Sequence, residues 1–348
     1  MHIVNPVIIR FKKTMLLMIL AGVLAGCSAN HEGLAQRNNE TVDMSRSAWI
    51  VYWDLNSGEK DLARIGKRIG KLVYFAAYFD ELDRLFVPPQ LQELKNENLR
   101  KRHHAESYLS VVNDKKNISG SIILKDVDLL KRVLATDELI EKHIGDIINL
   151  AKKGEYDGIE IDYERIWKDE FLSRQFVKFA NRIALKAREN QLKIRIVLEP
   201  GAPFASKQFA KGPEYVVMFY NLFGTHSGPG PKANTEFINK LLVQMAELPG
   251  EKTAAFSLGG CIWGSDGKKQ YITEQEAITH AKAYDAVPKR DEASQSLYFQ
   301  YENDNVTYHV WYADVKTIHH WKKLAEAKGV NNIALWRLGG NPEIEKIR

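Results

Sequence analysis

The stretch DGIEIDYE, residues 157–164, decides how this 348-residue chain folds. Acidic and apolar side chains alternate along it, and residues two apart on a β-strand point to the same face. One face of this strand therefore carries three carboxylates while the other is apolar. Burying like charges costs far more free energy than burying apolar groups, so the row needs a reason. The acidic residues are Glu160, Asp162 and Glu164, and the apolar residues are Ile159, Ile161 and Tyr163.

Eight short apolar runs, most of them separated by helix-like segments, extend from residue 48 to the end of the chain. Strands that alternate with helices are typical of a parallel sheet with crossover helices. Eight such strands in roughly 300 residues favour a closed (β/α)8 TIM barrel of the α/β class over an open doubly wound sheet. No glycine-rich phosphate loop follows any run, which counts against a dinucleotide fold. The predicted strands are 48–53, 71–77, 107–112, 157–164, 193–199, 215–220, 253–259 and 332–337.

Amphipathic helices are predicted between several of these strands, because apolar residues recur there at helical spacing. Gly154 is the expected stop of the first of them. The link between the fifth and sixth strands is short and marked by Gly and Pro, which predicts a reduced helix. The predicted helices are 137–154, 173–190 and 235–248.

A small α+β insertion, about 264–313, is predicted between the seventh and eighth strands. It holds a helix at about 273–286 and two strand-like runs, 296–302 and 306–313. Asn303-Asp304-Asn305 between the two runs is a turn signal. We expect this insertion to lie on the barrel rim.

The N-terminal residues 1–26 have the features of a secretory leader: a basic start and a short apolar run, 15–26. That run is too short to cross a bilayer core of about 30 Å as a helix. It ends in Leu-Ala-Gly-Cys27, which resembles a bacterial lipobox, so we expect Cys27 to carry a lipid anchor. An ordinary signal peptide with an incidental cysteine is the alternative. Residues 27–46 are polar and aperiodic and predict a flexible tether, and 47–348 form the barrel.

The charge and the two cysteines bear on the partners and the disulfides that this chain can have. Without the leader's three basic residues, the formal net charge falls from +5 to +2. No basic stripe is interleaved with aromatic residues, so we expect no nucleic-acid partner. With Cys27 lipidated, Cys261 has no partner for an intrachain disulfide and is expected to be a buried apolar residue. We expect a monomer attached to the bacterial cell envelope.

The predicted barrel explains why three acids lie on one face of the strand. Ile159, Ile161 and Tyr163 suit the helix side of the strand, so the three acids would point inward and run towards the C-terminal mouth. Barrel enzymes keep their active sites at that mouth. Neighbouring charge and desolvation raise the pKa of one carboxyl in such a row, which then can protonate a leaving group. An exposed edge strand with acids facing water is the structural alternative.

DGIEIDYE resembles the DGxDxDxE signature of glycoside hydrolase family 18, the chitinase-type barrel enzymes. Asp157, Gly158, Asp162 and Glu164 match the signature, and Glu160 stands where the family usually has Asp. Three further segments resemble the family in the same order along the chain. They are SYLSVVND (107–114), VVMFYNLFGTHSGPGP (216–231) and IALWRLGG (333–340), and the resemblance covers about residues 47–345.

The resemblance implies a mechanism in which the substrate's own N-acetyl group attacks the sugar. Glu164 would protonate the glycosidic oxygen, Asp162 would orient the acetamido group, and Glu160 would hold or share a proton with Asp162. Tyr220 would hydrogen-bond the acetyl carbonyl, and the ring of Trp336 would lie beneath the sugar and stack against it. No metal or cofactor is needed, although carboxylates alone can hold Mg²⁺ or Ca²⁺.

Further residues are candidates for substrate binding. Met218 and Tyr220 occupy the family's MxYD positions, but its aspartate is Asn221 here, which leaves the site one negative charge poorer. For the strand-end residues, the alternatives are a place in the pocket lining and a role in packing or a salt bridge. For Trp263, the alternatives are a sugar platform and a core aromatic. The candidates for substrate binding are Asp157, Met218, Asn221, Trp336, Tyr52, Phe75, Asn113, Glu199 and Trp263.

Two function classes remain open at this point. One is a retaining glycosidase that cleaves β-linked N-acetylglucosamine glycans, either chitin-type, peptidoglycan or the chitobiose core. The other is a chitinase-like lectin that binds such a glycan without turnover. Lectins of the family commonly lack the terminal glutamate, and Glu164 is present here, which favours the enzyme.

Overall fold

The computed structural model describes residues 42–101, 103–116, 121–205 and 208–347. The chain divides into two units, Met1–Asn39 and Glu40–Arg348, and all described residues belong to the second. The expected leader, the expected lipidation at Cys27 and most of the expected tether therefore lie outside the described residues and stay predictions. Among the described helices, none has both the length and the apolar character that a membrane crossing requires.

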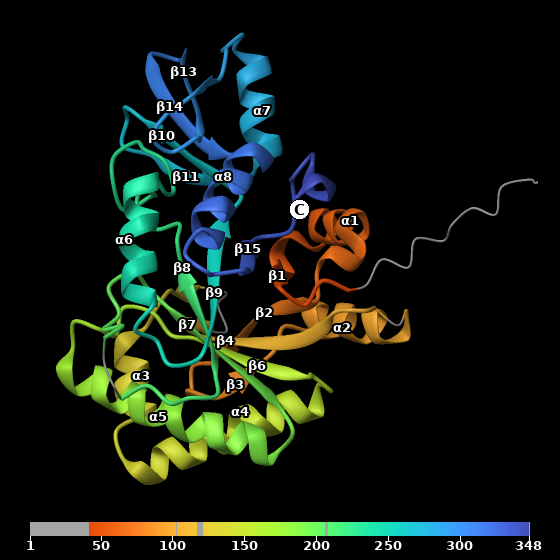
Figure 1. The fold of residues 1–348 in the computed structure, drawn as a ribbon, viewed down its shortest axis with the longest axis vertical. Coiled ribbons are helices and arrows are strands. Elements are labelled where there is room, and N and C mark those ends of the chain that lie inside the picture. Colours follow the sequence, from red (N-terminus) through yellow and green to blue (C-terminus); the bar gives the residue numbers. More distant parts are fainter. Residues whose placement is uncertain (1–41, 102, 117–120, 206–207, 348) are drawn as a thin grey trace, which may run out of the picture. The chain divides into compact units, whose positions relative to one another are not determined.

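Eight parallel strands close into a barrel, so the predicted (β/α)8 architecture is confirmed (Figure 1). Each strand pairs with its two neighbours in the order β1-β2-β4-β6-β7-β8-β9-β15, and β15 pairs with β1 to complete the ring. All eight coincide with predicted strands to within a few residues. Their bounds are β1 Arg46–Val51, β2 Lys71–Phe79, β4 Glu106–Lys116, β6 Gly158–Asp162, β7 Lys193–Leu198, β8 Glu214–Met218, β9 Glu251–Ser257 and β15 Asn332–Trp336.

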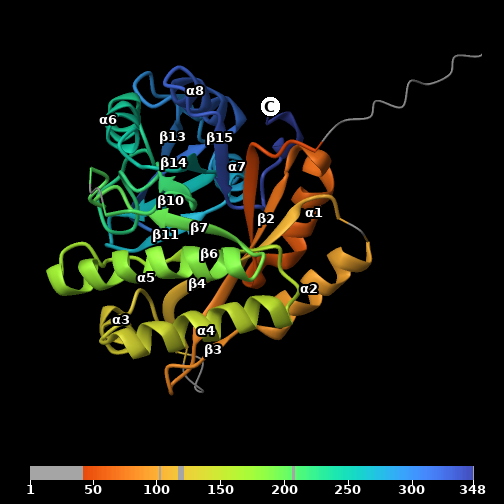
Figure 2. The same ribbon diagram turned by 60° about the horizontal axis from the view of Figure 1, so that its bottom comes forward.

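Helices and short 3-10 turns connect these strands, and no helix is found among the described residues between β7 and β8. Figure 2 shows α4 and α5 side by side on the outer side of the sheet. Two short strands, β3 Leu85–Phe86 and β5 Ile122–Ile123, pair with the C-terminal ends of β2 and β4. The helices are α1 Leu55–Ile65, α2 Pro89–Arg100, α3 Val127–Val133, α4 Asp137–Lys153, α5 Glu170–Glu189, α6 Thr235–Met245 and α8 Val315–Glu326, with 3-10 turns at Tyr52–Asp54, Gly66–Arg68 and Ile344–Lys346.

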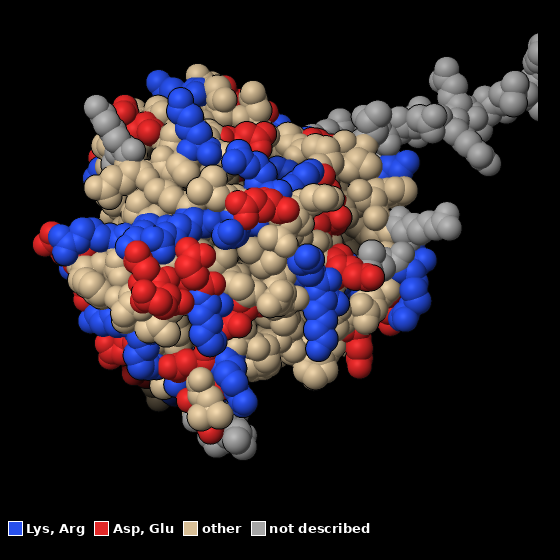
Figure 3. All heavy atoms as spheres, turned by 90° about the horizontal axis from the view of Figure 1, so that it is seen from below, with Lys and Arg blue, Asp and Glu red and all other residues tan. Residues whose placement is uncertain are grey.

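Side-chain chemistry sets where the helices begin. Asp169 caps α5 by accepting a hydrogen bond from the backbone N–H of Leu172 at 2.9 Å, which satisfies one of the otherwise unpaired N–H groups of the first turn. On the surface over α4 and α5, basic and acidic side chains are interspersed (Figure 3). Asp137 of α4 pairs there with Lys178 and Arg182 of α5.

The folded unit begins earlier than the predicted boundary between tether and barrel. The backbone N–H of Asp43 donates to the carbonyl of Lys67 at 3.0 Å, and Arg46 opens β1. Residues 43–46 therefore belong to the barrel and not to a tether.

The insertion between β9 and α8 is a five-stranded antiparallel sheet with one helix. It starts at Gly259 and not near 264, because Gly259 adopts a φ of +65° and turns the chain out of the barrel. Gly260 follows, where a β-carbon would lie 1.7 Å from the carbonyl oxygen of Trp311. The elements are β10 Gly259–Gly264, β11 Lys269–Ile272, α7 Glu274–Ala283, β12 Lys289–Arg290, β13 Leu297–Asn303 and β14 Val306–Ala313.

The barrel interior holds charged side chains as well as apolar ones. Arg195 of β7 is fully buried, and its Nε lies 3.1 Å from a carboxylate oxygen of Glu160 and 4.0 Å from one of Glu214. Lys71 completes the group with a 2.6 Å contact to Glu214. We call these four residues the barrel ion network. They are adjacent because Glu160, Arg195 and Glu214 are register partners on β6, β7 and β8.

The outer core contains one titratable residue whose behaviour can be tested. His143 of α4 is buried against β6, and its Nε2 lies 2.7 Å from the hydroxyl of Tyr163. Burial lowers the pKa of His143 to about 4.

We expect this histidine to make the fold sensitive to acid. The unfolded chain takes up a proton at His143 as pH falls below about 6.5, whereas the folded chain does so only near pH 4, so stability is lost within that window. His143→Gln keeps a hydrogen-bonding partner for Tyr163 but cannot titrate. Urea unfolding at pH 7.5 and pH 4.5 should show a loss of stability that is smaller in the variant by about 2 to 3 kcal/mol. Equal losses in both proteins would contradict the assignment.

Candidate active site

The acid row lies as the alternation predicts. Ile159, Ile161 and Tyr163 are buried in the core between the barrel and its helices, whereas the side chains of Glu160 and Asp162 are inside the barrel. Glu164 lies two residues beyond the end of β6, at the C-terminal mouth, and its side chain is 14% exposed. The row therefore runs from the barrel centre to its mouth.

Glu160 is fixed at the inner end of the row. Its Oε1 accepts a 2.6 Å hydrogen bond from the indole N–H of Trp49, and its Oε2 faces Arg195. Burial raises the pKa of Glu160, although the charge of Arg195 opposes this. Its contacts are thus with Trp49 and Arg195, and no described hydrogen bond joins it to Asp162, contrary to the expected proton sharing.

Asp162 is the most perturbed acid of the row. Burial raises its pKa well above the ordinary value, and the negative charges of Glu164 and Glu160 raise it further. Its Oδ1 is buried and accepts no hydrogen bond from the described residues. Because an unpaired buried acceptor is costly, this oxygen is placed to receive a donor from outside the chain.

Glu164 is held by its backbone and by one cation. Its N–H donates to Oδ1 of Asn113 at 3.0 Å, and Nδ2 of Asn113 donates back to the carbonyl of Glu164 at 3.2 Å. Asn113 is therefore a residue that positions Glu164, not one that lines a pocket. The carboxylate of Glu164 forms an ion pair with the ammonium of Lys125.

Lys125 is itself fixed by the end of β4. Its backbone N–H donates to Oδ1 of Asp114 at 2.8 Å, and the N–H of Asp126 donates to the carbonyl of Asn113 at 2.8 Å. Burial alone would lower the pKa of Lys125, but the charge of Glu164 and the hydrogen bond to it raise that pKa above its ordinary value.

Tyr220 and its neighbours lie beyond β8 on the same side. Tyr220 is 8% exposed, and burial together with the charges of Asp162 and Glu164 raises the pKa of its hydroxyl well above 10.0. It therefore stays a neutral hydrogen-bond donor. The side-chain amide of Asn221 donates to the sulfur of buried Met218 at 3.3 Å and so links two residues of this segment.

Aromatic rings gather beside the row. The ring of Trp336 lies 4.9 Å from that of Phe75 and 5.8 Å from that of Trp49, centroid to centroid and edge to face. Trp53 contacts Phe75 at 5.9 Å and is 51% exposed. Tyr52 accepts a hydrogen bond from Lys116. The exposed ring of Trp53 suits a sugar platform better than that of Trp263.

Glu199 at the end of β7 is also near Glu164. Its Oε2 accepts a 2.7 Å hydrogen bond from the backbone N–H of Arg165. Burial and the charge of Glu164 raise the pKa of Glu199. The carboxylate thus fixes the turn that follows Glu164.

Two candidates are engaged in contacts within the protein. Asp157 precedes β6 at the opposite end of the barrel, where its Oδ2 accepts hydrogen bonds from the N–H and hydroxyl of Ser107, each at 2.7 Å. Trp263 is 3% exposed, and its indole N–H donates to the carbonyls of Gly224 and Ser227 at 3.1 and 3.2 Å. Both residues are structural, so the predicted substrate contacts are corrected.

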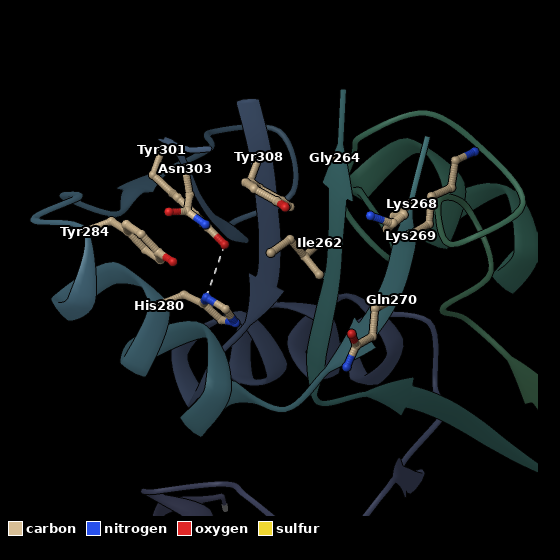
Figure 4. A pocket seen from close by; sticks show the side chains of 10 residues that line it. All are labelled: Ile262, Gly264, Lys268, Lys269, Gln270, His280, Tyr284, Tyr301, Asn303 and Tyr308. Carbon is tan, nitrogen blue, oxygen red and sulfur yellow. Dashed lines mark hydrogen bonds between the residues drawn. The ribbon is translucent and has the colours of Figure 1, made fainter. Parts of the chain in front are cut away.

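Two cavities lie elsewhere among the described residues. One, of about 530 Å³, is within the insertion, where Figure 4 shows Tyr284, Tyr301 and His280 around it. The hydroxyl of Tyr301 lies 3.1 Å from Nδ1 of His280. No Asp or Glu lines this cavity, so it lacks the carboxyl group that the predicted mechanism requires. The other, of about 500 Å³, is at the N-terminal end of the barrel beside Glu106 and Lys193.

The described residues include no group of three or more His, Cys, Asp or Glu placed to hold a metal ion.

Comparisons with known proteins bear on the sequence and the fold. No protein-family model matches the chain. It is 25% identical over 242 residues to the uncharacterized glycosylase YvbX of Bacillus subtilis, which is 65% of this chain and 70% of YvbX. The spore cortex-lytic enzyme SleL of Bacillus megaterium superposes with a TM-score of 0.72 at 18% identity, over 86% of this chain and 72% of SleL. A chitinase from Chromobacterium violaceum gives 0.71 at 16% identity, over 86% and 96%. The chain shares the barrel fold of these two solved structures.

Several residues of the site were not predicted from the sequence. Arg195 points into the barrel, and its sequence neighbours are Ile194 and Ile196. A single cation in an otherwise apolar strand indicates a buried ion pair, so the sequence could have predicted that Arg195 pairs with a buried acid such as Glu160. Lys125 carries no such signal, because it lies in an irregular segment and reaches Glu164 only through the folded chain.

Proposed function

We propose that this chain is a retaining glycoside hydrolase of β-linked N-acetylglucosamine glycans. The observation that carries the proposal is the pairing of Glu164 at the barrel mouth with buried Asp162, whose Oδ1 lacks a donor. The likeness to a glycosylase by sequence, and to chitinase and cortex-lytic barrels by fold, supports it.

In the proposed reaction Glu164 donates a proton to the glycosidic oxygen while the bond from the anomeric carbon to that oxygen breaks. The carbonyl oxygen of the substrate's acetamido group forms the new bond to the anomeric carbon from the other face. Water then opens this oxazolinium intermediate and returns a proton to Glu164, which gives net retention.

Asp162 and Tyr220 support the internal nucleophile. The unpaired Oδ1 of Asp162 accepts the acetamido N–H, which orients the group and stabilises its developing positive charge. The hydroxyl of Tyr220 donates to the acetyl oxygen. Trp336 and the exposed Trp53 offer aromatic faces to the apolar face of the sugar.

An assay with two matched oligomers tests this mechanism. The protein should cleave an N-acetylglucosamine tetramer and release the β-anomer first, seen by proton NMR. It should not cleave the deacetylated glucosamine tetramer, because that substrate lacks the attacking carbonyl. Equal cleavage of both, or first release of the α-anomer, would contradict the mechanism.

Two observations favour a binding protein as the second candidate. The ion pair with Lys125 occupies the carboxylate of the proposed acid Glu164, and Asn221 is an amide where the resembling sequences have an aspartate. Tight binding of the tetramer with no product would favour the lectin.

The cell-envelope assignment is a proposal of its own. It rests on the lipobox-like segment before Cys27, which lies outside the described residues. An anchored protein at that place meets soluble glycan chains or the glycan of the wall.

A further inference from the structure

We propose that the barrel mouth selects a glycan that carries carboxylates, and that Lys125 exchanges Glu164 for a substrate carboxylate when such a glycan binds. This inference rests on the proposed function and names its substrate class. Peptidoglycan strands have this chemistry, whereas chitin and the chitobiose core have no carboxylates.

The first observation is the ion pair itself. Glu164 is the proposed proton donor to the glycosidic oxygen, and the ammonium of Lys125 contacts the same carboxylate. Lys125 and the glycosidic oxygen therefore compete for Glu164. Its side chain is 32% exposed, so its ammonium is within reach of a ligand.

The second observation is that two further lysines near the mouth form no ion pair with the described residues. Lys232 is 9% exposed, its Nζ lies 4.0 Å from the ring centroid of Tyr271, and no carboxylate among the described residues pairs with it. Burial lowers its pKa to about 8, and the positive charge of Lys125 contributes. The ammonium groups of Lys232 and Lys125 are therefore close enough to repel one another.

Lys116 adds a third cation at this end of the barrel. Its Nζ lies 3.9 and 4.1 Å from the ring centroids of Tyr52 and Tyr78 and forms no ion pair with the described residues. Cations that rest on aromatic rings without a carboxylate are available to an anionic ligand.

These contacts predict discrimination between ligands. A neutral glycan offers Lys125 no carboxylate in place of Glu164, so displacing Lys125 loses a direct ion pair and leaves only the more distant charges of Asp162 and Glu199. A carboxylated glycan replaces Glu164 as the partner of Lys125. The side chain of Glu164, no longer held by Lys125, can then face the glycosidic oxygen.

The decisive experiment compares kcat/KM on one glycan with and without its charge. Peptide-free peptidoglycan strands carry free lactyl carboxylates, and converting these to primary amides removes only the charge. The wild type should prefer the carboxylated strand by about 10- to 100-fold, the range expected for a hydrogen bond between charged groups.

Variants of Lys125 then assign the effect. Lys125→Met should bring the ratio of the two kcat/KM values close to one, while Lys125→Arg should retain the preference. Lys131→Met removes the same charge from an exposed pair with Asp169 and should leave the ratio unchanged. A melting temperature for each variant shows that it is folded.

The outcomes separate the inference from the proposed function. Equal rates on both strands, or a preference that survives Lys125→Met, would overturn the inference while the glycosidase assignment stands. Strands with intact peptides, compared with peptide-free strands, show whether the stem peptide or the lactyl group supplies the carboxylate. Failure to cleave any N-acetylglucosamine substrate would instead overturn the proposed function.

Discussion

Replacing Glu164 with glutamine is expected to lower kcat on an N-acetylglucosamine oligomer by about 100- to 10,000-fold, the contribution typical of a positioned general acid. The amide keeps the size of the side chain and can still hydrogen-bond, but it has no proton to give to the leaving oxygen. KM should change less than kcat, because the reacting proton matters in the transition state and not in the bound ground state.

The measurement is steady-state release of reducing ends by wild type and Glu164→Gln. Glu170→Gln is a suitable control, since Glu170 lies on the outer surface of α5 and pairs only with exposed Arg174 among the described residues. It should keep wild-type rates. If Glu164→Gln did so too, the proton donor would have to be another residue, and Glu199 would be the first to test because it lies beside Glu164.

A leaving group that needs no proton gives a second check on this role. An aryl glycoside with a good leaving group should restore much of the rate of Glu164→Gln, since little protonation of the departing oxygen is required. Loss that is equal on both substrates would point instead to damaged binding.

The sequence was informative where side chains alternate. The spacing of DGIEIDYE predicts which residues point into the barrel, because strand geometry has a fixed period of two. The alternation of strands and helices predicts the barrel for a similar reason. Direction along the strand is also fixed, yet the resemblance placed Asp157 at the sugar, although Asp157 precedes β6 and Glu164 lies seven positions further on, at the mouth.

The sequence was uninformative where the contact depends on irregular chain. Lys125 reaches Glu164 because the end of β4 holds both of their backbones, through Asn113 and Asp114. No periodic pattern records such a contact. The prediction that Trp263 binds sugar was wrong for a related reason. Its place after a strand can be predicted from the sequence, but its hydrogen-bond acceptors, the carbonyls of Gly224 and Ser227, lie about 40 positions earlier in the chain.

The barrel ion network connects the inner end of the acid row to the stability of the fold. Arg195 serves Glu160 and Glu214 together, and both carboxylates are almost inaccessible to water. Its charge lowers the pKa of Glu214 against the effect of burial and partly offsets the raised pKa of Glu160. Arg195 thereby keeps the floor beneath Asp162 ordered.

Replacing Arg195 with methionine should therefore destabilise the protein by about 3 to 5 kcal/mol, the cost of leaving a buried charge without its partner. The variant should lose more stability at pH 8 than at pH 5. Without the guanidinium, the folded state requires Glu160 to be protonated. Protonation becomes less favourable as pH rises, so the free energy of unfolding of the variant falls. Urea unfolding at the two pH values measures both effects.

A double variant separates charge from packing. Glu160→Gln added to Arg195→Met removes the unpaired carboxylate and should recover part of the lost stability, most clearly at pH 8. Arg182→Met is the control, because that arginine forms an exposed pair with Asp137, and exposed pairs add little. Should Arg195→Met and Arg182→Met unfold at the same urea concentration, the ion network would not stabilise the barrel, and the order of the acid row would have to come from Trp49 and the surrounding apolar packing.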